Sequence, residues 1–438
     1  MTEQPGITFM NSHVTKECSA VRLWLSAIAV FLIAIVVRAA FLIRNGVVTT
    51  LDTVDYVTIA QNLMGHGVFS LSTSFPYIPT IRRPPLYSFF LAAVSPGLTA
   101  ILLQVALDAA CALGVYFLTL SAGRIKQALT AGLFYAFYPS AIVASCSLMS
   151  EALFSFTLVT AVVFLVLGIR RDAPSASIAG SVCLGLTILC RPIAGAYLIA
   201  LVATLIASGT VPRRYLHSAI LLVGATSILS PWLARCYAVS GRFVFVQGFS
   251  AINVYVPTMM ELDQADEVVF WPWPHLAHTP YGSRLDKANT PAEMVEADHF
   301  GVAEALRNIR HNPRGYVRLR LRTLPHLFLS SFDSFTGIDR SFRQLLASRD
   351  VPHITVKFLM MAVFSVAPLI LGVFGLPSIR CNSVALLCAS IWLTTLVVHM
   401  PMWIESRFWL PAVPFLLVNA SCGFAKLVER PRSTSVAA

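Results

Sequence analysis

The stretch LDTVDYVTIAQNLMGHGVFSLSTSFPYIPTIRRPPL, residues 51–86, lies between two long apolar segments and concentrates acidic, aromatic, glycine and arginine residues. Its first half predicts a short amphipathic helix, because apolar residues recur with the 3.6-residue period of an α-helix. The residues of this face are Tyr56, Ile59, Ala60, Leu63 and Met64. Asp52 and Asp55 stand at the start of the helix, glycines end it, and paired arginines before two prolines close the stretch. Acids at one end and cations at the other suit a substrate with a reacting hydroxyl and a phosphate.

The composition is that of a membrane protein that crosses the bilayer several times. The chain has 438 residues, of which 56% are hydrophobic and 12% charged, and its mean hydropathy is +0.72, whereas a soluble domain is about 25% charged. The net charge of +11 is typical of cytoplasmic loops that face anionic lipid. No basic groove interleaved with aromatic residues appears, so nucleic acid is not an expected partner. The nine cysteines form no CxxC pair and predict neither a disulfide framework nor a zinc site.

Apolar segments predict an all-α protein with about ten transmembrane helices. We expect them near residues 23–43, 98–120, 128–148, 152–168, 176–190, 193–208, 215–233, 356–376, 384–400 and 408–425. Lysines and arginines fall in alternate connections, which places both termini in the cytoplasm and residues 51–97 and 234–355 outside. The run 86–94 is too short to span a bilayer, so we expect an interfacial helix there. The first span is expected to be an uncleaved anchor.

This topology divides the chain into three parts. Residues 1–233 form an N-terminal membrane module whose first outer loop, 44–97, carries the candidate chemistry. Residues 234–355 form a long outer loop, turn-rich over 250–290 and helical from Pro291 onward. Residues 356–438 form the C-terminal transmembrane helices and a cytoplasmic tail, of which 430–438 is expected to be disordered.

Arginines recur every three or four residues in the helical part of the long loop and predict a basic stripe on one helix face. They are Arg307, Arg310, Arg314, Arg318 and Arg322. Such a stripe can lie on phosphate head groups of the membrane, or one of its arginines can also hold a lipid-linked substrate.

Asp52 is the leading catalytic candidate, because an acid in an outer loop can take a proton from an acceptor hydroxyl. The alternative is structural: Asp is a favoured N-cap, and Asp55 three residues later resembles a capping box. Arg82 and Arg83 also have two possible roles. Their guanidinium groups can bind a phosphate bidentately, or they can anchor the loop at the membrane interface.

Other charged residues lie at or near the predicted outer ends of spans. Glu151 opens a span, where an acid also suits a helix N-terminus. Glu405 and Arg407 lie just before the last span, on its outer side, and could simply pair with each other. Asp108 lies inside a span, where a polar partner is expected. Arg38 could face a phosphate, but we expect it to extend its head group toward the interface.

The order of these motifs resembles the GT-C superfamily of integral-membrane glycosyltransferases, in the branch of protein O-mannosyltransferases and aminoarabinose transferases. The resemblance spans nearly the whole chain. It is carried by the stretches 52–56, 65–70, 83–87, 150–154, 189–192, 231–235, 312–316 and 405–411, among them DTVDY, RPPLY, SEALF and ESRFWLP.

The resemblance implies an inverting transfer from a sugar carried on a polyprenyl phosphate. The residue that matches Asp52 would be the general base, and those that match Arg83 and Arg407 would hold the lipid phosphate. Tyr56, Arg82, Glu151 and Glu405 complete the candidate substrate-binding set. The family's frequent Asp-Glu pair is Asp52-Thr53 here, which puts in doubt the metal role that some relatives build on paired acids.

Residues and resemblance together predict a multi-pass inner-membrane enzyme that transfers a hexosyl or pentosyl group to a hydroxyl at the outer, periplasmic face. The acceptor could be lipid, protein or polysaccharide. No cofactor is expected, with a divalent metal left open. The alternative is a polytopic transporter or flippase of lipid-linked sugars, which should show repeated halves and broken spans.

Overall fold

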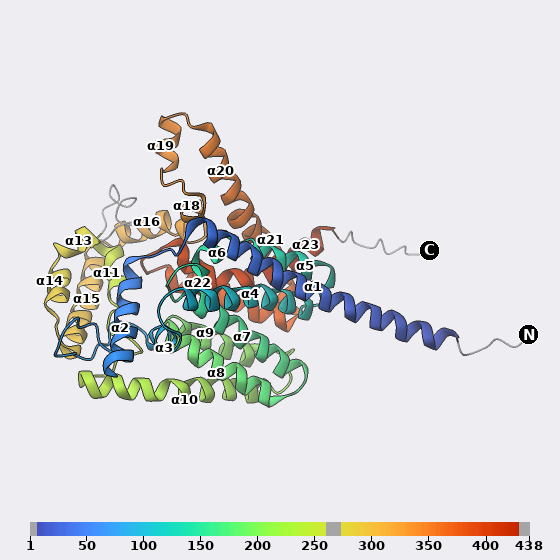
Figure 1. The fold of residues 1–438 in the computed structure, drawn as a ribbon, viewed down its shortest axis with the longest axis horizontal. Coiled ribbons are helices and arrows are strands. Elements are labelled where there is room, and N and C mark those ends of the chain that lie inside the picture. The colour runs from blue at the N-terminus through green and yellow to red at the C-terminus, as the bar shows by residue number, and fades with distance from the viewer. Residues whose placement is uncertain (1–6, 260–272, 429–438) are drawn as a thin grey trace, which may run out of the picture.

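The computed structural model describes residues 7–259 and 273–428 (Figure 1). Over these residues it contains helices, loops and two isolated β-bridges but no β-strand, which confirms the all-α prediction. The predicted disordered tail, 430–438, lies outside the described residues, as does part of the turn-rich stretch, 260–272.

Six helical segments in the described part are long and apolar enough to cross a membrane. They belong to α1 (Ile7–Asn45), α4 (Leu98–Ser121), α7 (Glu151–Arg170), α10 (Arg214–Ser240), the continuous run from α20 (Val351–Met361) through α21 (Ala367–Gly375) to η2 (Leu376–Arg380), and η3 (Ser406–Ala412) with α23 (Val413–Val428). The pair α5 (Ile125–Ala136) and α6 (Pro139–Ser145) is bent by 53° and makes a seventh if it is one span. Shorter apolar helices are α3 (Pro85–Val94), α8 (Pro174–Cys190), α9 (Ala194–Ala207) and α22 (Ser383–His399). Each predicted span coincides with one of these helices or, for 128–148, with the bent pair α5 and α6. Because α8, α9 and α22 are short, the count of ten stays a prediction.

The helices pack into a bundle whose two ends differ. The start of α1 and the end of α23 lie at one end, on the right of Figure 1. The elements of both predicted outer loops, among them α2 (Leu51–His66), α11 (Ile252–Met259) and α15 (Pro291–His311), gather at the other end. The loops 51–97 and 234–355 therefore share one end of the molecule.

The loop after α2 is held by side-chain hydrogen bonds. Gly67 caps α2 with a left-handed backbone (φ 66°), which a residue without Cβ adopts at little cost. The Asn62 amide then donates to the carbonyls of Ser70 (2.8 Å) and Ser72 (3.0 Å), and Arg235 of α10 donates to the carbonyl of Thr80 (2.6 Å). These bonds position the arginine pair at the start of α3. Met64, predicted on the apolar face of α2, is 54% exposed.

The long outer loop is more helical than predicted. Its described part continues with α13 (Trp273–Ala277), α14 (Pro280–Lys287), α15, α16 (Pro313–Thr323), α17 (Pro325–Phe328), α18 (Asp333–Thr336) and α19 (Phe342–Ala347). The prediction that residues 250–290 are rich in turns is wrong where α11, α13 and α14 form helices. The prediction that the arginines lie on one continuous helix is also wrong. Helix α15 ends before Asn312, whose side chain caps the next helix, α16, by accepting a hydrogen bond from the Gly315 amide (2.9 Å). The arginine stripe therefore lies on two helices.

Glycines let the membrane helices approach closely, as is common when small residues form the interface. A Cβ on Gly180 of α8 would lie 2.9 Å from the carbonyl oxygen of Ala161 on α7, and one on Gly224 of α10 would lie 2.0 Å from the Ser181 hydroxyl of α8. A Cβ on Gly375 of α21 would lie 2.0 Å from the Asn419 carbonyl of α23. A larger residue at these positions would force the helices apart.

Arg38 corrects another expectation. Its side chain does not reach the interface but is fully buried between α1 and α4, where its guanidinium pairs with Asp108 at 2.5 Å. Tyr135 donates to the other Asp108 oxygen at 2.9 Å, and Arg38 also donates to the carbonyls of Ala34 and Ala136. Hydrocarbon strongly disfavours an unpaired ion, so each charge keeps the other inside the bundle.

Candidate active site

Asp52 lies between two arginines that come from distant parts of the chain. Its Oδ1 accepts a hydrogen bond from Nη2 of Arg83 (2.6 Å), and its Oδ2 accepts one from Nη1 of Arg407 (3.0 Å). Arg83 also donates from Nε to Asp55 Oδ2 (2.8 Å). The two carboxylates of α2 therefore hold the guanidinium of Arg83 in one orientation, and Asp52 joins it to Arg407.

The capping role considered for Asp52 is wrong. The N-cap of α2 is Thr50, whose backbone N–H donates to the Thr53 hydroxyl (3.0 Å), so Asp52 is already inside the first turn. Thr50 and Thr53 form the capping box that the sequence suggested for Asp52 and Asp55. The carboxylate of Asp52 therefore binds the two arginines instead of capping the helix.

The arginines also set the charge state of Asp52. Burial by itself raises the pKa of this carboxyl, but the positive charges of Arg83 and Arg407 outweigh that effect and lower the pKa to about 2. Asp52 is thus ionised at neutral pH and, while both arginines hold it, a weak base.

A second group of charges surrounds Glu151, the first residue of α7. Arg191, between α8 and α9, donates to Glu151 Oε1 (2.5 Å) and to the Ser150 hydroxyl (3.0 Å). Arg407 approaches the same Glu151 oxygen at 3.7 Å and pairs directly with Glu405, as the sequence allowed. Glu151 Oε2 is buried without a hydrogen-bond partner among the described residues.

Arg191 was not among the candidate site residues from the sequence. The available signal was an Arg-Pro pair, Arg191-Pro192, between two apolar segments, the same dipeptide as Arg83-Pro84. Only the packing of α8 against α7 brings its guanidinium to Glu151.

Tyr56 and Arg82 complete the predicted set. Tyr56 is buried under Arg83, whose guanidinium carbon lies 5.3 Å from the ring centre, and it packs edge-on against Tyr87. Arg82 instead covers the ring of Phe249 (4.7 Å) and approaches Asp55 at 3.4 Å. Cation–π contact fixes both guanidinium groups at little cost in hydration.

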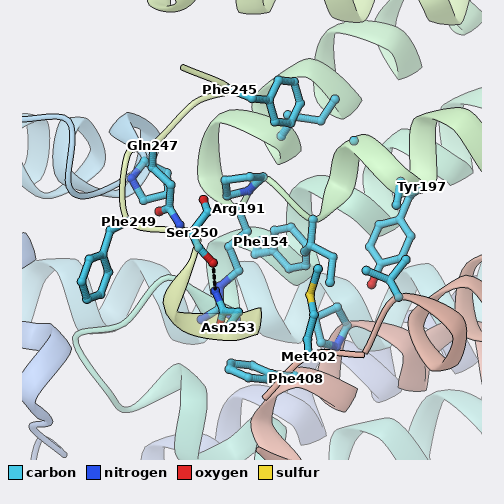
Figure 2. A pocket seen from close by; sticks show the side chains of 18 of the residues that line it. Phe154, Arg191, Tyr197, Phe245, Gln247, Phe249, Ser250, Asn253, Met402 and Phe408 are labelled. Carbon is cyan, nitrogen blue, oxygen red and sulfur yellow. Dashed lines mark hydrogen bonds between the residues drawn. The ribbon is translucent and has the colours of Figure 1, made fainter. Parts of the chain in front are cut away.

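Two cavities meet at Arg407. The first cavity, of about 610 Å³, is lined by Asp52, Tyr56, Arg83, Arg191 and Arg407 at its charged end. Its remaining walls are largely apolar side chains from α8, α9, α10 and the segment after α10, including Ile188, Leu198, Ile199, Leu229 and Phe245. Figure 2 shows the part around Arg191, Phe154, Phe245 and Tyr197, with Phe408 and Met402 on the opposite wall.

The second cavity, of about 490 Å³, also borders Arg407 and has a larger polar share than the first, although apolar side chains such as Leu329 and Phe335 line it too. Glu151, Asp333, Glu405, His326 and several hydroxyl side chains line it, and Arg82 lines neither cavity. Burial raises the pKa of Glu405, although Arg407 beside it acts in the opposite direction.

The described residues contain no cluster of three or more His, Cys, Asp or Glu side chains arranged to hold a metal ion. The acids of the site are separated by arginines instead. The arrangement can bind an anion between guanidinium groups and present a carboxylate next to it.

Comparison with solved structures identifies the architecture. The chain aligns over 92% of its length with the oligosaccharyltransferase AglB from the archaeon Archaeoglobus fulgidus, in the apo form (TM-score 0.52, 14% identity) and in complex with an inhibitory peptide and a dolichol-phosphate (TM-score 0.53, 12% identity). The chain has the GT-C fold. It covers 50% of the AglB chain, so it spans about half the length of that relative.

ArnT from Cupriavidus metallidurans, solved bound to undecaprenyl phosphate, also aligns with this chain, over 93% of its length and 78% of ArnT (TM-score 0.38, 15% identity). No family model and no curated protein sequence matches the chain. The predicted fold class is confirmed, and the apolar helices are those of a multi-pass membrane protein.

Proposed function

We propose that this protein is an inverting glycosyltransferase that moves a sugar from a polyprenyl-phosphate donor to a hydroxyl acceptor at the outer face of the membrane. The observation that carries the proposal is the division of the first cavity. Arg83, Arg191 and Arg407 line its charged end, and apolar side chains of membrane helices line the rest. A polyprenyl phosphate has the same division between an anionic head and a hydrocarbon tail.

The lining of the cavity includes a surface residue of α9: Ile199 is 72% exposed. The tail of a lipid would enter there from the bilayer while its phosphate meets the arginines. The archaeal oligosaccharyltransferase with this fold was solved with a dolichol-phosphate, which is a ligand of the same chemical class.

The reaction needs one displacement. The acceptor oxygen forms a bond to the anomeric carbon, the bond from that carbon to the phosphate oxygen breaks, and the lipid phosphate leaves with the electron pair. Arg83 and Arg407 neutralise the charge that develops on the phosphate. Asp52 takes the proton of the acceptor hydroxyl.

Donor binding activates Asp52 in this scheme. Both carboxylate oxygens are held by arginines, which keeps the pKa of Asp52 near 2. A donor phosphate competes for the same guanidinium groups, and every hydrogen bond it takes from Asp52 raises the basicity of the carboxylate. The base therefore becomes effective when the leaving group is in place.

The test uses the full chain in proteoliposomes with a panel of polyprenyl-phosphate sugars. Transfer should release polyprenyl phosphate and yield a glycosylated acceptor, or free sugar when water is the acceptor. A transporter or flippase would move the lipid-linked sugar across the bilayer without cleaving it. Translocation of intact donor, with no cleavage of any sugar in the panel, would contradict the proposal.

A further inference from the structure

The charged cluster presents opposite charge to its two cavities. The first cavity is lined by three guanidinium groups, Arg83, Arg191 and Arg407, and by one carboxylate, Asp52. The second cavity is lined by three carboxylates, Glu151, Asp333 and Glu405, and by one guanidinium, that of Arg407. The Arg191–Glu151 pair divides its charges between the cavities, because Arg191 lines the first and Glu151 the second.

From this asymmetry we propose that the second cavity binds the acceptor and selects an uncharged polyhydroxy group, such as a sugar head group, over a phosphorylated one. The inference rests on the proposed transferase function and specifies the acceptor that it uses. The size of the second cavity, about 490 Å³, falls within the roughly 300–1,000 Å³ of small-molecule sites.

Glu151 supplies an independent sign of a missing ligand. Its side chain is 3% exposed and lines the second cavity, and Oε2 has no hydrogen-bond partner among the described residues. A buried carboxylate oxygen normally accepts a hydrogen bond. A ligand hydroxyl can donate to it, whereas a phosphate oxygen would be repelled.

The remaining polar lining is made of hydroxyl groups. It includes Thr50, Ser140, Ser147, Ser331, Ser334 and Ser406. Two of its carboxylates pair with cations that do not line the cavity, Asp333 with Lys357 (2.9 Å) and Glu151 with Arg191 (2.5 Å). His326 is the remaining titratable group of the lining. Hydroxyls and carboxylates together suit the many O–H donors and acceptors of a sugar.

The proposal is tested by cysteine protection, which does not require turnover. The full chain in nanodiscs carries Ser140→Cys in the second cavity, with Cys18 and the exposed Cys381 replaced by serine. The probes are methyl β-glucoside and methyl β-glucoside 6-phosphate. The neutral glucoside should slow labelling of the new thiol severalfold, and the phosphorylated one should not.

Ser250→Cys, in the first cavity, is the matched control and should be protected by the phosphorylated probe instead. Adding Ser334→Lys at the exposed rim of the second cavity should extend protection of Ser140→Cys to the phosphorylated probe. Equal or better protection by the phosphorylated probe without this lysine overturns the proposal, and so does protection by neither probe. Cleavage of the lipid-linked donor is measured separately, so the transferase function can stand if the acceptor class fails.

Discussion

Nη1 of Arg407 lies 3.0 Å from Oδ2 of Asp52, although 355 residues separate the two in the chain. The contact joins the first outer loop to the start of the last membrane helix, and Arg83 holds the other oxygen of the same carboxylate. Arg191 pairs with Glu151, and Arg407 pairs with Glu405, so acids and cations alternate through the site.

Asp52→Asn should remove glycosyl transfer while the protein still folds. The amide cannot accept the hydroxyl proton, and loss of a general base typically lowers the rate by about 10²–10⁴-fold. Since Thr50 caps α2, the helix loses no cap. The measurement is transfer from a lipid-phosphate donor, normalised to folded protein. Asp55→Asn, the control on the same helix, should cost much less, and near-parental activity of Asp52→Asn would return Asp52 to a structural role.

The pH dependence should differ between kcat and kcat/KM. In the free enzyme the arginines hold the pKa of Asp52 at about 2, so the carboxylate stays ionised and kcat/KM should be level as the pH falls toward 4. Once the donor phosphate engages the arginines, the pKa returns toward its ordinary value of about 3.9, and kcat should begin to fall at a higher pH. The two profiles are measured between pH 4 and 8 on protein shown to remain folded. Coincident acid limbs would show that donor binding does not release Asp52.

Arg83→Lys should weaken use of the donor more than Arg82→Lys. Arg83 contacts Asp52 and Asp55 through two different nitrogens, and a lysine keeps the charge but cannot reproduce this fork. Arg82 covers Phe249 and lines neither cavity, so its replacement by lysine preserves the charge at lower cost. The donor concentration at half-maximal rate should rise about tenfold or more for Arg83→Lys, as for loss of one charge-assisted bond. Equal effects of the two substitutions would argue against a donor-binding role specific to Arg83.

Arg38 and Asp108 should stabilise the bundle only as a pair. Arg38→Met leaves a buried carboxylate without its cation and should destabilise the protein by about 3–5 kcal/mol. Asp108→Leu leaves the buried Arg38 cation without its anion and should cost a similar amount. The double variant removes both charges and should recover most of that loss. Thermal unfolding in detergent of the two single variants and the double variant measures the coupling. Additive losses would mean that the two charges do not stabilise each other.

Cysteine accessibility should show which end of the bundle faces outward. Positions 74, 280 and 171 are exposed; 74 lies in the loop between α2 and α3, 280 at the start of α14, and 171 directly after α7. In a background without accessible native cysteines, a membrane-impermeant reagent added to intact cells should label Ser74→Cys and Pro280→Cys but not Arg171→Cys. Reversed labelling would place the site on the cytoplasmic side.

The sequence by itself determined the elements whose signal is local. Apolar runs and their periods placed α1, α4, α7 and the other membrane helices, and the short run before Pro96 gave α3. Helical periodicity and helix end signals operate within about 20 residues, so they can be read without knowing the partners. The resemblance added the order of motifs, and with it the fold.

Only the tertiary structure decided which charges meet and which way they face. Nothing near Arg38 in the sequence indicates Asp108, and nothing near Asp52 indicates Arg407. The cap at Thr50 and the break at Asn312 were missed because several neighbouring residues could serve as caps, and small differences in packing select among them. The opposite charge of the two cavities exists only once α2, α7, α8 and η3 are packed together, because Coulomb interactions depend on distance in space rather than in sequence.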